Sequence, residues 1–314
     1  MGGPGPRRSQ PARVRRARPL VGRDQRARTR RSDLTVVLAF VLLVLLALPS
    51  AVAAQYTGPL IDAHSHVPNA TAINAYAAAA KRHNVSKVLL LGVGGVQKND
   101  SAWITDAQKK YPDLVIAGAP VAEPAAVDGL ESEIDRLGAR ALGEVHVRQL
   151  SRKIDRDPSG PEFQKLLEIA AKRKLPVVIH DDLDVRATER LDRALTARPD
   201  ATIILAHAGE SAPPRIESLL GRHPNLMVDL SGMHFQRKPP LATETGPIDP
   251  TWKALIEKMP DRFLFGVDVW APRLFEPAML DRLMTWARRV LGELKPDVAE
   301  KVAYTNAATL LGVK

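Results

Sequence analysis

The stretch LIDAHSH, from Leu60 to His66, places one acid and two histidines at alternate positions of a short apolar run. Residues two apart on a β-strand point to the same side of the strand. The pattern therefore predicts that Asp62, His64 and His66 share one face. That face holds a metal ion if other strands bring partners to it; otherwise the two histidines are ordinary buried, hydrogen-bonded side chains.

The rest of the chain alternates between apolar runs and longer segments that have apolar residues at helical spacing on one face. Runs of β-branched residues and Leu are typical of parallel strands buried on both sides. Eight such units in about 260 residues predict a (β/α)8 barrel, with one domain over residues 55–314. A doubly wound open sheet is the alternative, but no G-x-G-x-x-G motif follows the first run. The expected strands lie in the runs 60–66, 87–94, 114–120, 141–147, 176–182, 202–209, 226–232 and 263–269.

Polar residues end three of the later runs, where the strands of a barrel reach its catalytic mouth. His180 ends the fifth run, His207 the sixth and Asp268 the eighth. The chain has no cysteine, so a metal ion would be bound by imidazole and carboxylate groups. His64, His66, His180 and Asp268 form such a ligand set, and an open position on the ion would admit water.

The motifs IDAHSH, VVIHD, ILAHAG, VDLSG and FGVDV, in this order, resemble those of the amidohydrolase superfamily. The chain is most similar to the branch of metal-dependent hydrolases and decarboxylases typified by aminocarboxymuconate-semialdehyde decarboxylase, and the closing YTNAATLLGV resembles the final helix of that branch. The resemblance covers nearly all of residues 58–314. It implies a divalent metal ion, usually zinc, bound by His64, His66, His180 and Asp268.

The same resemblance implies the catalytic roles. His207 would polarise the substrate or orient the attacking water, with a role as second metal ligand or structural residue as the alternative. Asp268 would be both ligand and proton shuttle. A metal ion lowers the pKa of a bound water from 15.7 to about 7, so the expected reaction is hydrolysis of a C–O or C–N bond in a lactone, ester or amide. Non-oxidative decarboxylation of an aromatic or enoic acid is the alternative activity. The non-enzymatic alternative is an extracytoplasmic barrel that only binds a metal or ligand.

The fourth run, ALGEVHVR, leaves the number of metal ions open. Alternation predicts that Glu144, His146 and Arg148 share one face. Many relatives have a carboxylated lysine or a glutamate here that bridges two ions. Glu144 is therefore the bridge in a two-ion alternative, with His180 and His207 on the second ion, although one ion is favoured. The GE dipeptide also resembles TatD-type deoxyribonucleases, but the near-neutral folded part offers no clear phosphate-binding surface.

Other residues are expected to contact the substrate or to support the ligands. Arg148 is a candidate for binding a substrate carboxylate, with a salt bridge to a neighbouring acid as the alternative. His146 and His234 are expected to contact the substrate, the latter from an irregular segment, residues 233–250, that would cover the barrel mouth. The residues expected to support the ligands from behind are Asp62, Asp182 and Asp229.

The positive charge of the chain is concentrated at its N-terminus. The formal net charge is +10, and residues 1–54 carry +9 of it through eleven arginines against two aspartates. The remainder is nearly neutral, so nucleic acid is not an expected partner. Residues 1–33 form a basic leader that is expected to be disordered. Residues 34–54 are expected to be the apolar core and cleavage site of a signal peptide, or an uncleaved membrane anchor.

Both interpretations place the barrel outside the cytoplasm, with the N-terminus inside if the segment stays uncleaved. The segment TRRSDL, Thr29 to Leu34, also resembles a twin-arginine export signal. The expected partner is a small-molecule substrate. Contact with a membrane is expected only through the N-terminal segment, and a homodimer stays open. The expected cofactor is a divalent metal ion, with Zn²⁺ favoured.

Overall fold

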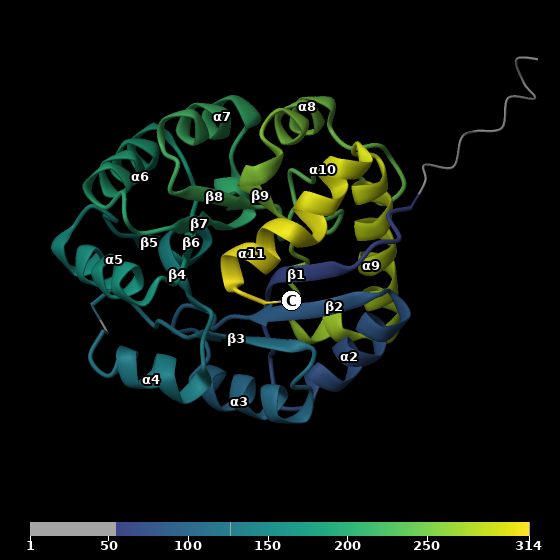
Figure 1. The fold of residues 1–314 in the computed structure, drawn as a ribbon, viewed down its shortest axis with the longest axis horizontal. Helices are drawn as coiled ribbons and strands as arrows, with labels where there is room; N and C mark the ends of the chain where they lie inside the picture. Colours follow the sequence, from purple (N-terminus) through teal and green to yellow (C-terminus); the bar gives the residue numbers. More distant parts are fainter. Residues whose placement is uncertain (1–54, 126, 314) are drawn as a thin grey trace, which may run out of the picture. The chain divides into compact units, whose positions relative to one another are not determined.

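Each of the eight predicted runs forms a strand in the computed structural model, which describes residues 55–125 and 127–313 (Figure 1). The strands are parallel, and neighbours along the chain pair with one another. The prediction of a (β/α)8 barrel is confirmed. Within the described residues the ring consists of β1 (Leu60–Ser65), β2 (Val85–Leu90), β3 (Val115–Ala119), β4 (Ala141–Gln149), β6 (Val177–Asp181), β7 (Ile203–Leu205), β8 (Leu226–Asp229) and β9 (Phe263–Leu264).

Backbone hydrogen bonds between β1 and the segment after β9 close the ring. The amide of Ala63 donates to the carbonyl oxygen of Phe265 at 2.9 Å, and the amide of Asp268 donates to that of His64 at 2.8 Å. The first and last strands are therefore neighbours, which brings Asp268 beside the histidines of the first run.

Helices cover the outer side of the strands (Figure 1). Proline occupies the first turn of α5, α7, α8 and α9, a position where its missing N–H costs no hydrogen bond. The side chains of Asp184 and Asp249 cap α6 and α8 by accepting from backbone amides. The helices are α2 (Ala72–Arg82), α3 (Asp100–Lys110), α4 (Leu130–Leu137), α5 (Pro161–Arg173), α6 (Val185–Ala197), α7 (Pro213–Arg222), α8 (Pro250–Lys258), α9 (Pro277–Gly292), α10 (Pro296–Glu300) and α11 (Asn306–Leu311).

The last helix closes one end of the barrel rather than joining the outer ring. Ala307 and Leu311 of α11 pack into an apolar cluster with inward-facing strand residues such as Ile61, Leu89 and Leu264. Figure 1 views the molecule from this end, with α11 across the strands. The sequence of residues 296–312 predicts a final helix that packs outside the barrel. This prediction is wrong for α11, because its apolar side chains pack against inward-facing residues of the strands.

Two segments add structure that the sequence pattern did not predict. The chain after β4 forms a 3₁₀ turn, η1 (Leu150–Arg152), and then β5 (Ile154–Asp155), which pairs antiparallel with the end of β4. The segment between β8 and α8 is largely irregular, as expected, and carries one antiparallel bridge between Ala242 and Ile248. Both segments reach the barrel mouth, because His234 and Arg152 line the cavity there.

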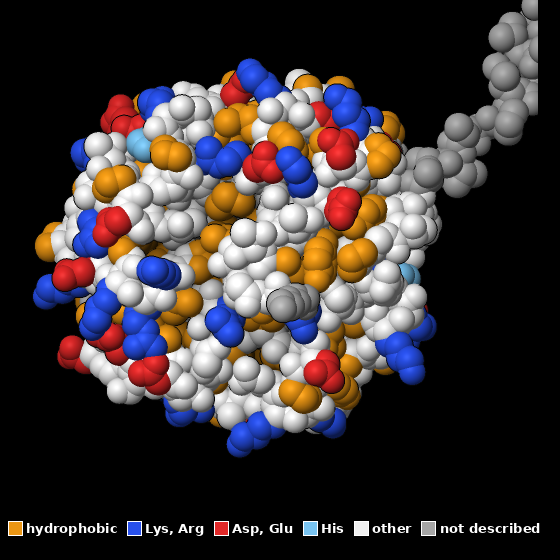
Figure 2. All heavy atoms as spheres, viewed as in Figure 1, with side chains coloured by type: hydrophobic (Ala, Val, Ile, Leu, Met, Phe, Trp, Pro, Cys, Tyr) orange, Lys and Arg blue, Asp and Glu red, His pale blue; other side chains and the backbone are white. Residues whose placement is uncertain are grey.

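Charged side chains of both signs are interspersed on the face that Figure 2 shows, without a broad region of one sign. In the part of the chain that the structure describes, no helix has both the length and the apolar character of a membrane span. The predicted leader (residues 1–33) and signal or anchor segment (residues 34–54) lie outside the described residues.

Candidate metal centre and active site

A cavity of about 240 Å³ opens at the carboxyl end of the strands, where barrel enzymes bind their substrates. Most of the predicted ligands and catalytic groups contribute to its wall. The side chains that line it are His66, Val93, Glu144, His146, Gln149, Ser151, Arg152, His180, His207, His234, Arg237, Asp268, Trp270, Arg273 and Leu274.

A bulge in β1 separates Asp62 from the two histidines. The pairing of β1 with β2 shifts register between Asp62 and Ser65, and a bulge reverses the alternation of the side chains that follow. The carboxylate of Asp62 accepts from the hydroxyl of Tyr76 on α2 at 2.6 Å, so it faces the helical layer. The prediction that Asp62 shares a face with His64 and His66 is wrong. Asp62 supports them from behind, because it also accepts from the amide of His64 at 3.2 Å.

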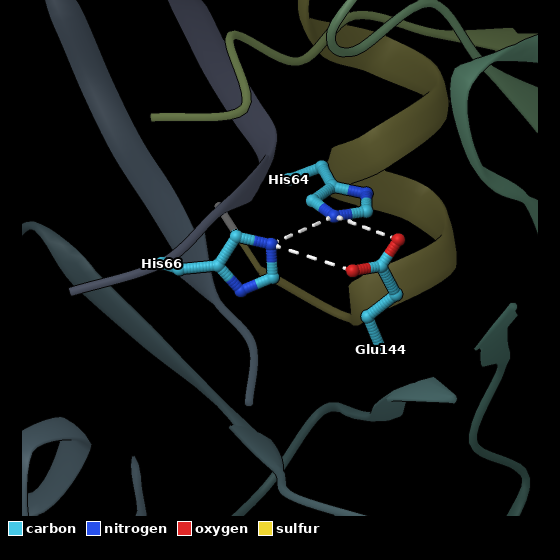
Figure 3. Close-up of side chains that lie close together, drawn as sticks. All are labelled: His64, His66 and Glu144. Atoms are coloured by element: carbon cyan, nitrogen blue, oxygen red, sulfur yellow. Dashed lines mark hydrogen bonds and ion pairs between the residues drawn. The ribbon is translucent and has the colours of Figure 1, made fainter. Parts of the chain in front are cut away.

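His64 and His66 aim their ring nitrogens at one point (Figure 3). Nδ1 of His64 lies 2.9 Å from the carboxylate of Asp229, and Nδ1 of His66 lies 2.9 Å from the carbonyl oxygen of Leu91. Each Nδ1 therefore donates its proton outward, and each Nε2 presents a lone pair. The two Nε2 atoms are 3.2 Å apart. Lone pairs that face each other at this distance repel unless a cation lies between them, which is how second-shell groups prepare histidines for a metal ion.

Glu144 lies at the centre of the histidines. Its Oε1 is 3.0 Å from Nδ1 of His180 and 3.2 Å from Nε2 of His207. Its Oε2 is 3.6 Å from Nε2 of His66 and 3.3 Å from Nε2 of His146. Burial alone would raise the pKa of Glu144, but the surrounding histidines hold it well below its usual range. The side chain is therefore an ionised carboxylate with one oxygen toward each side of the site.

His207 presents a lone pair to the centre. Its Nδ1 lies 3.0 Å from the carbonyl oxygen of Ser231 and 2.9 Å from the hydroxyl of the same residue. That hydroxyl donates to Asp229, so both neighbours of Nδ1 are acceptors and Nδ1 carries the proton. Nε2 then faces Glu144 as an acceptor. The φ angle of His207 is +56°, a strained region for a residue with a side chain, and such strain is typical of functional sites.

His180 lies between two carboxylates. Nδ1 faces Glu144, and Nε2 is 3.1 Å from Asp182. Burial by itself would lower the pKa of His180, but these carboxylates raise it to about 10. Asp182 also accepts from the amide of Leu150 at 2.8 Å. Asp182 thus fixes the orientation of the His180 ring. The sequence predicted this supporting role for Asp182.

Asp268 faces the cavity from the segment after β9. Its Oδ1 is 3.5 Å from Nε2 of His66, and its Oδ2 accepts from Arg237 at 2.7 Å. Burial would raise the pKa of this carboxyl, but the histidines around it, His207 first, lower it. Asp268 also has a φ of +56°. The groups meet around Gly232, where an added Cβ would lie 2.9 Å from Oδ2 of Asp268 and from Nδ1 of His207, and 3.0 Å from Arg237.

Arg148 does not share the inward face of Glu144 and His146. The pairing of β4 with β6 shifts register between Leu142 and Val145 and again between His146 and Arg148. The second shift turns Arg148 away, and its guanidinium binds the Asp182 carbonyl and, at 2.7 Å, the Asp184 carboxylate. It is not among the side chains that line the cavity. The prediction of a common face for all three residues is therefore wrong for Arg148.

His146 and His234 both line the cavity. The Nδ1 atom of His146 is buried and has no hydrogen-bond partner in the described residues. The Nδ1 atom of His234 accepts from the amide of Gln236 at 3.2 Å. Burial lowers the pKa of both rings, to about 4 for His234. Both rings are therefore neutral at pH 7.

The donor set fits a divalent metal ion. Three buried groups bring one ligand atom from each residue within 4.8 Å of the others. Imidazole nitrogen and carboxylate oxygen are the ligands that zinc and similar ions take when no thiolate is present. Two of the groups share Glu144. The groups are His64, His66 and Glu144; His64, His207 and Asp268; and Glu144, His180 and His207.

Sequence patterns missed several residues that shape the site. Tyr76 lies within a helix and Gly232 within a loop, and neither carries a local signal of its contact with an acid. Arg237 was recognisable only as a charge in an irregular segment. Its role depends on β8 and β9 being neighbours, because this pairing places the segment after β8 against Asp268.

A model of the family described as Amidohydrolase matches residues 61–313. The chain belongs to the amidohydrolase family. Together with the buried histidine, glutamate and aspartate clusters, this membership makes it a metal-dependent enzyme of that family. A comparison with the sequences of curated proteins finds no match.

Solved structures of low sequence identity share the fold. An uncharacterised TIM-barrel protein from Bordetella bronchiseptica is 18% identical, with a TM-score of 0.59 over 81% of this chain and 99% of that chain. The 2,6-dihydroxybenzoate decarboxylase from Rhizobium is 17% identical, with a TM-score of 0.57 over 82% and 99%. The 4-oxalomesaconate hydratase from Rhodopseudomonas palustris is 12% identical, with a TM-score of 0.54 over 81% and 95%.

Proposed function

We propose that this chain is a metal-dependent hydrolase that cleaves a C–O or C–N bond of a small lactone, ester or amide. The observation that carries the proposal is the placement of Asp268 in the cavity. One of its oxygens lies 3.5 Å from the ligand atom of His66, and the other is held by Arg237. An ionised carboxylate with one free oxygen beside the metal-binding groups is placed to take a proton from attacking water.

We further propose two metal positions that share Glu144, instead of the single ion that the sequence favoured. Glu144 lies between two groups of histidines: its Oε2 is 3.6 Å from Nε2 of His66, whereas its Oε1 is 3.0 Å from Nδ1 of His180 and 3.2 Å from Nε2 of His207. His64, whose Nε2 is 3.8 Å from Oε1 and 3.2 Å from Nε2 of His66, lies between the two groups. The lone pair on Nε2 suits His207 to a ligand role better than to donation toward an oxyanion. When bound, the metal polarises the scissile carbonyl and lowers the pKa of water.

The chain's own residues would move one proton through the reaction. Water adds to the carbonyl carbon and gives a proton to Oδ1 of Asp268, since Oδ2 is held by Arg237. The C–O or C–N bond then breaks, and Asp268 returns the proton to the leaving oxygen or nitrogen. Asp268 is ionised at neutral pH, because its pKa lies below its usual range, and it therefore has a lone pair for that proton.

Decarboxylation of an aromatic or enoic acid is the second candidate. It is favoured by the cationic side chains in the cavity wall, such as Arg237 and Arg273, which would hold a carboxylic acid substrate. The decarboxylase from Rhizobium has the same fold at low identity, which is a likeness of the scaffold. We also propose that the enzyme acts outside the cytoplasm. This proposal rests only on the sequence of residues 34–54, which is typical of a signal peptide or membrane anchor.

The test uses the full-length chain loaded with zinc and incubated in oxygen-18 water with lactones, esters, amides and unsaturated or aromatic acids. Hydrolysis puts one solvent oxygen into the acid product, whereas decarboxylation releases carbon dioxide without doing so. We expect Asp268→Asn to keep part of its metal and lose nearly all turnover. Full activity of this variant, or product without solvent oxygen, would overturn the assigned reaction.

A further inference from the structure

The arginines of the barrel differ in what their guanidinium groups bind. Within residues 55–125 and 127–313, nearly all of them contact a carboxylate or a backbone carbonyl, as Arg82 does with Asp281. Three do not. The guanidinium groups of Arg140 and Arg152 have no hydrogen bond or ion pair to a described residue, and that of Arg273 has only a 3.3 Å contact with the amide oxygen of Gln236.

Two of these three arginines line the catalytic cavity. Arg152 ends the turn η1 after β4, and Arg273 lies in η4 (Pro272–Phe275) after β9. Both side chains line the same cavity as His146 and His234. The cavity therefore has two cationic groups without anionic partners, in addition to the side chains of the ligand cluster.

The wall of this cavity also contains apolar side chains. Trp270 is 41% exposed, one of the few large apolar side chains that the barrel leaves in contact with water. It lines the cavity together with Leu274 and Val93. An exposed aromatic ring next to unpaired guanidinium groups is a surface that binds the apolar body and the anionic end of one small molecule.

We propose that the outer part of the cavity is a subsite for a carboxylate of the substrate, which Arg152 and Arg273 hold away from the metal-binding groups while the apolar body of the substrate lies on Trp270. The inference rests on the proposed hydrolase function. The substrate class is then a lactone, ester or amide that carries a second, unreacted carboxylate. Guanidinium groups bind carboxylates through charge-assisted hydrogen bonds, and no acid of the described chain competes for these two.

A purely structural role explains the positions of Arg152 and Arg273 less well than a role in binding does. Other arginines at the ends of helices and strands meet acids, as Arg148 meets Asp184 and Arg156 meets Glu123. Solvation alone explains a cationic side chain on the outer surface, such as Arg140. It does not explain why two such side chains lie in the wall of the cavity that is also lined by Glu144, His180 and Asp268.

The binding test uses the full-length protein, with and without zinc, titrated with benzoate as the probe and followed by tryptophan fluorescence. The probe is expected to change the emission of Trp270, and Trp270→Phe should remove that change. Arg152→Gln and Arg273→Gln are each expected to weaken binding about fivefold to tenfold, and the double variant by more than about thirtyfold, as for partly exposed charge-assisted hydrogen bonds. Arg140→Gln removes the same charge elsewhere and should bind as the unaltered protein does.

The outcomes separate this subsite from the proposed function. Benzoate binding that persists without zinc and depends on both arginines supports the subsite, even if no hydrolysis is found. If esters are hydrolysed, the double arginine variant should also have a raised KM for the half-ester of a dicarboxylic acid but not for the diester. Binding that is lost in His64→Ala/His66→Ala but unchanged in the double arginine variant places the carboxylate on the metal and overturns the inference. Equal binding in the arginine variants and in Arg140→Gln overturns it as well.

Discussion

Replacing Gly232 by alanine tests whether the catalytic groups meet as closely as the structure has them. Gly232 has a φ of +65°, and an added Cβ would lie 2.9 Å from Asp268 and His207 and 3.0 Å from Arg237. The left-handed conformation costs an L-residue roughly 1 kcal/mol. Overpacking in a filled site costs typically another 1–3 kcal/mol. We therefore expect Gly232→Ala to lower the free energy of unfolding by about 2–4 kcal/mol.

The matched control is Gly138→Ala at the end of α4. Its φ is +58°, but its Cβ would meet nothing within 4 Å, so only the conformational cost applies. At about 2–4 °C per kcal/mol for a domain of this size, thermal unfolding should shift by about 2–4 °C for Gly138→Ala and by about 4–16 °C for Gly232→Ala.

Metal retention distinguishes damage to the metal site from a general loss of stability. After dialysis against a weak chelator, Gly232→Ala should hold metal at least about tenfold more weakly than the unaltered chain, because Asp268 and His207 must move apart. Gly138→Ala should retain metal normally. If the two variants were alike in both unfolding and metal content, the close approach of the three side chains around Gly232 would be refuted.

Three further predictions concern Tyr76, His234 and Glu144. Tyr76→Phe removes a hydrogen-bond donor to the buried Asp62 carboxylate and should lower the free energy of unfolding by about 1.5–3 kcal/mol. The control, Tyr111→Phe, loses a bond to the neutral Asn74 side chain and should lower it by less than about 1.5 kcal/mol, as measured by thermal unfolding. Equal losses would contradict the contact of Tyr76 with an ionised Asp62. The pKa of His234 is about 4 when folded and near 6.5 when unfolded, so the unfolded chain binds the extra proton first and stability should fall as pH drops from 6.5 to 4. His234→Gln should flatten urea unfolding midpoints over that range, and an unchanged slope would count against a neutral, buried ring. Glu144→Gln should reduce the zinc content from about two ions per chain to about one by elemental analysis, and two ions in this variant would exclude the bridge.

The period of the apolar runs was enough to predict the barrel, because each parallel strand is buried on both faces and reads as a continuous apolar segment. It was also enough to predict which strand ends carry His180, His207 and Asp268, since all the strands end at the same mouth.

Strict alternation failed where a strand bulges. In β1 the register shift after Asp62 turns this residue toward Tyr76, and in β4 the shift after His146 turns Arg148 toward Asp184. Such bulges arise from pairing with neighbouring strands, so a period-two rule applied to one strand cannot predict them. The sequence assigned a substrate carboxylate to Arg148 of β4, whereas Arg152 and Arg273, which line the cavity, lie in the turns η1 and η4.

The closure of the ring by β1 and β9 has a consequence for when the site can form. His64 is made early in synthesis, whereas Asp268, which lies beside it, and α11, which fills the floor, come near the end. Pairs so distant along the chain join late, because long loops must close first. A growing chain, or one kept unfolded during transport, therefore has its histidines but no complete metal site. Loading with metal should follow the release and folding of the whole chain, in whichever compartment that takes place.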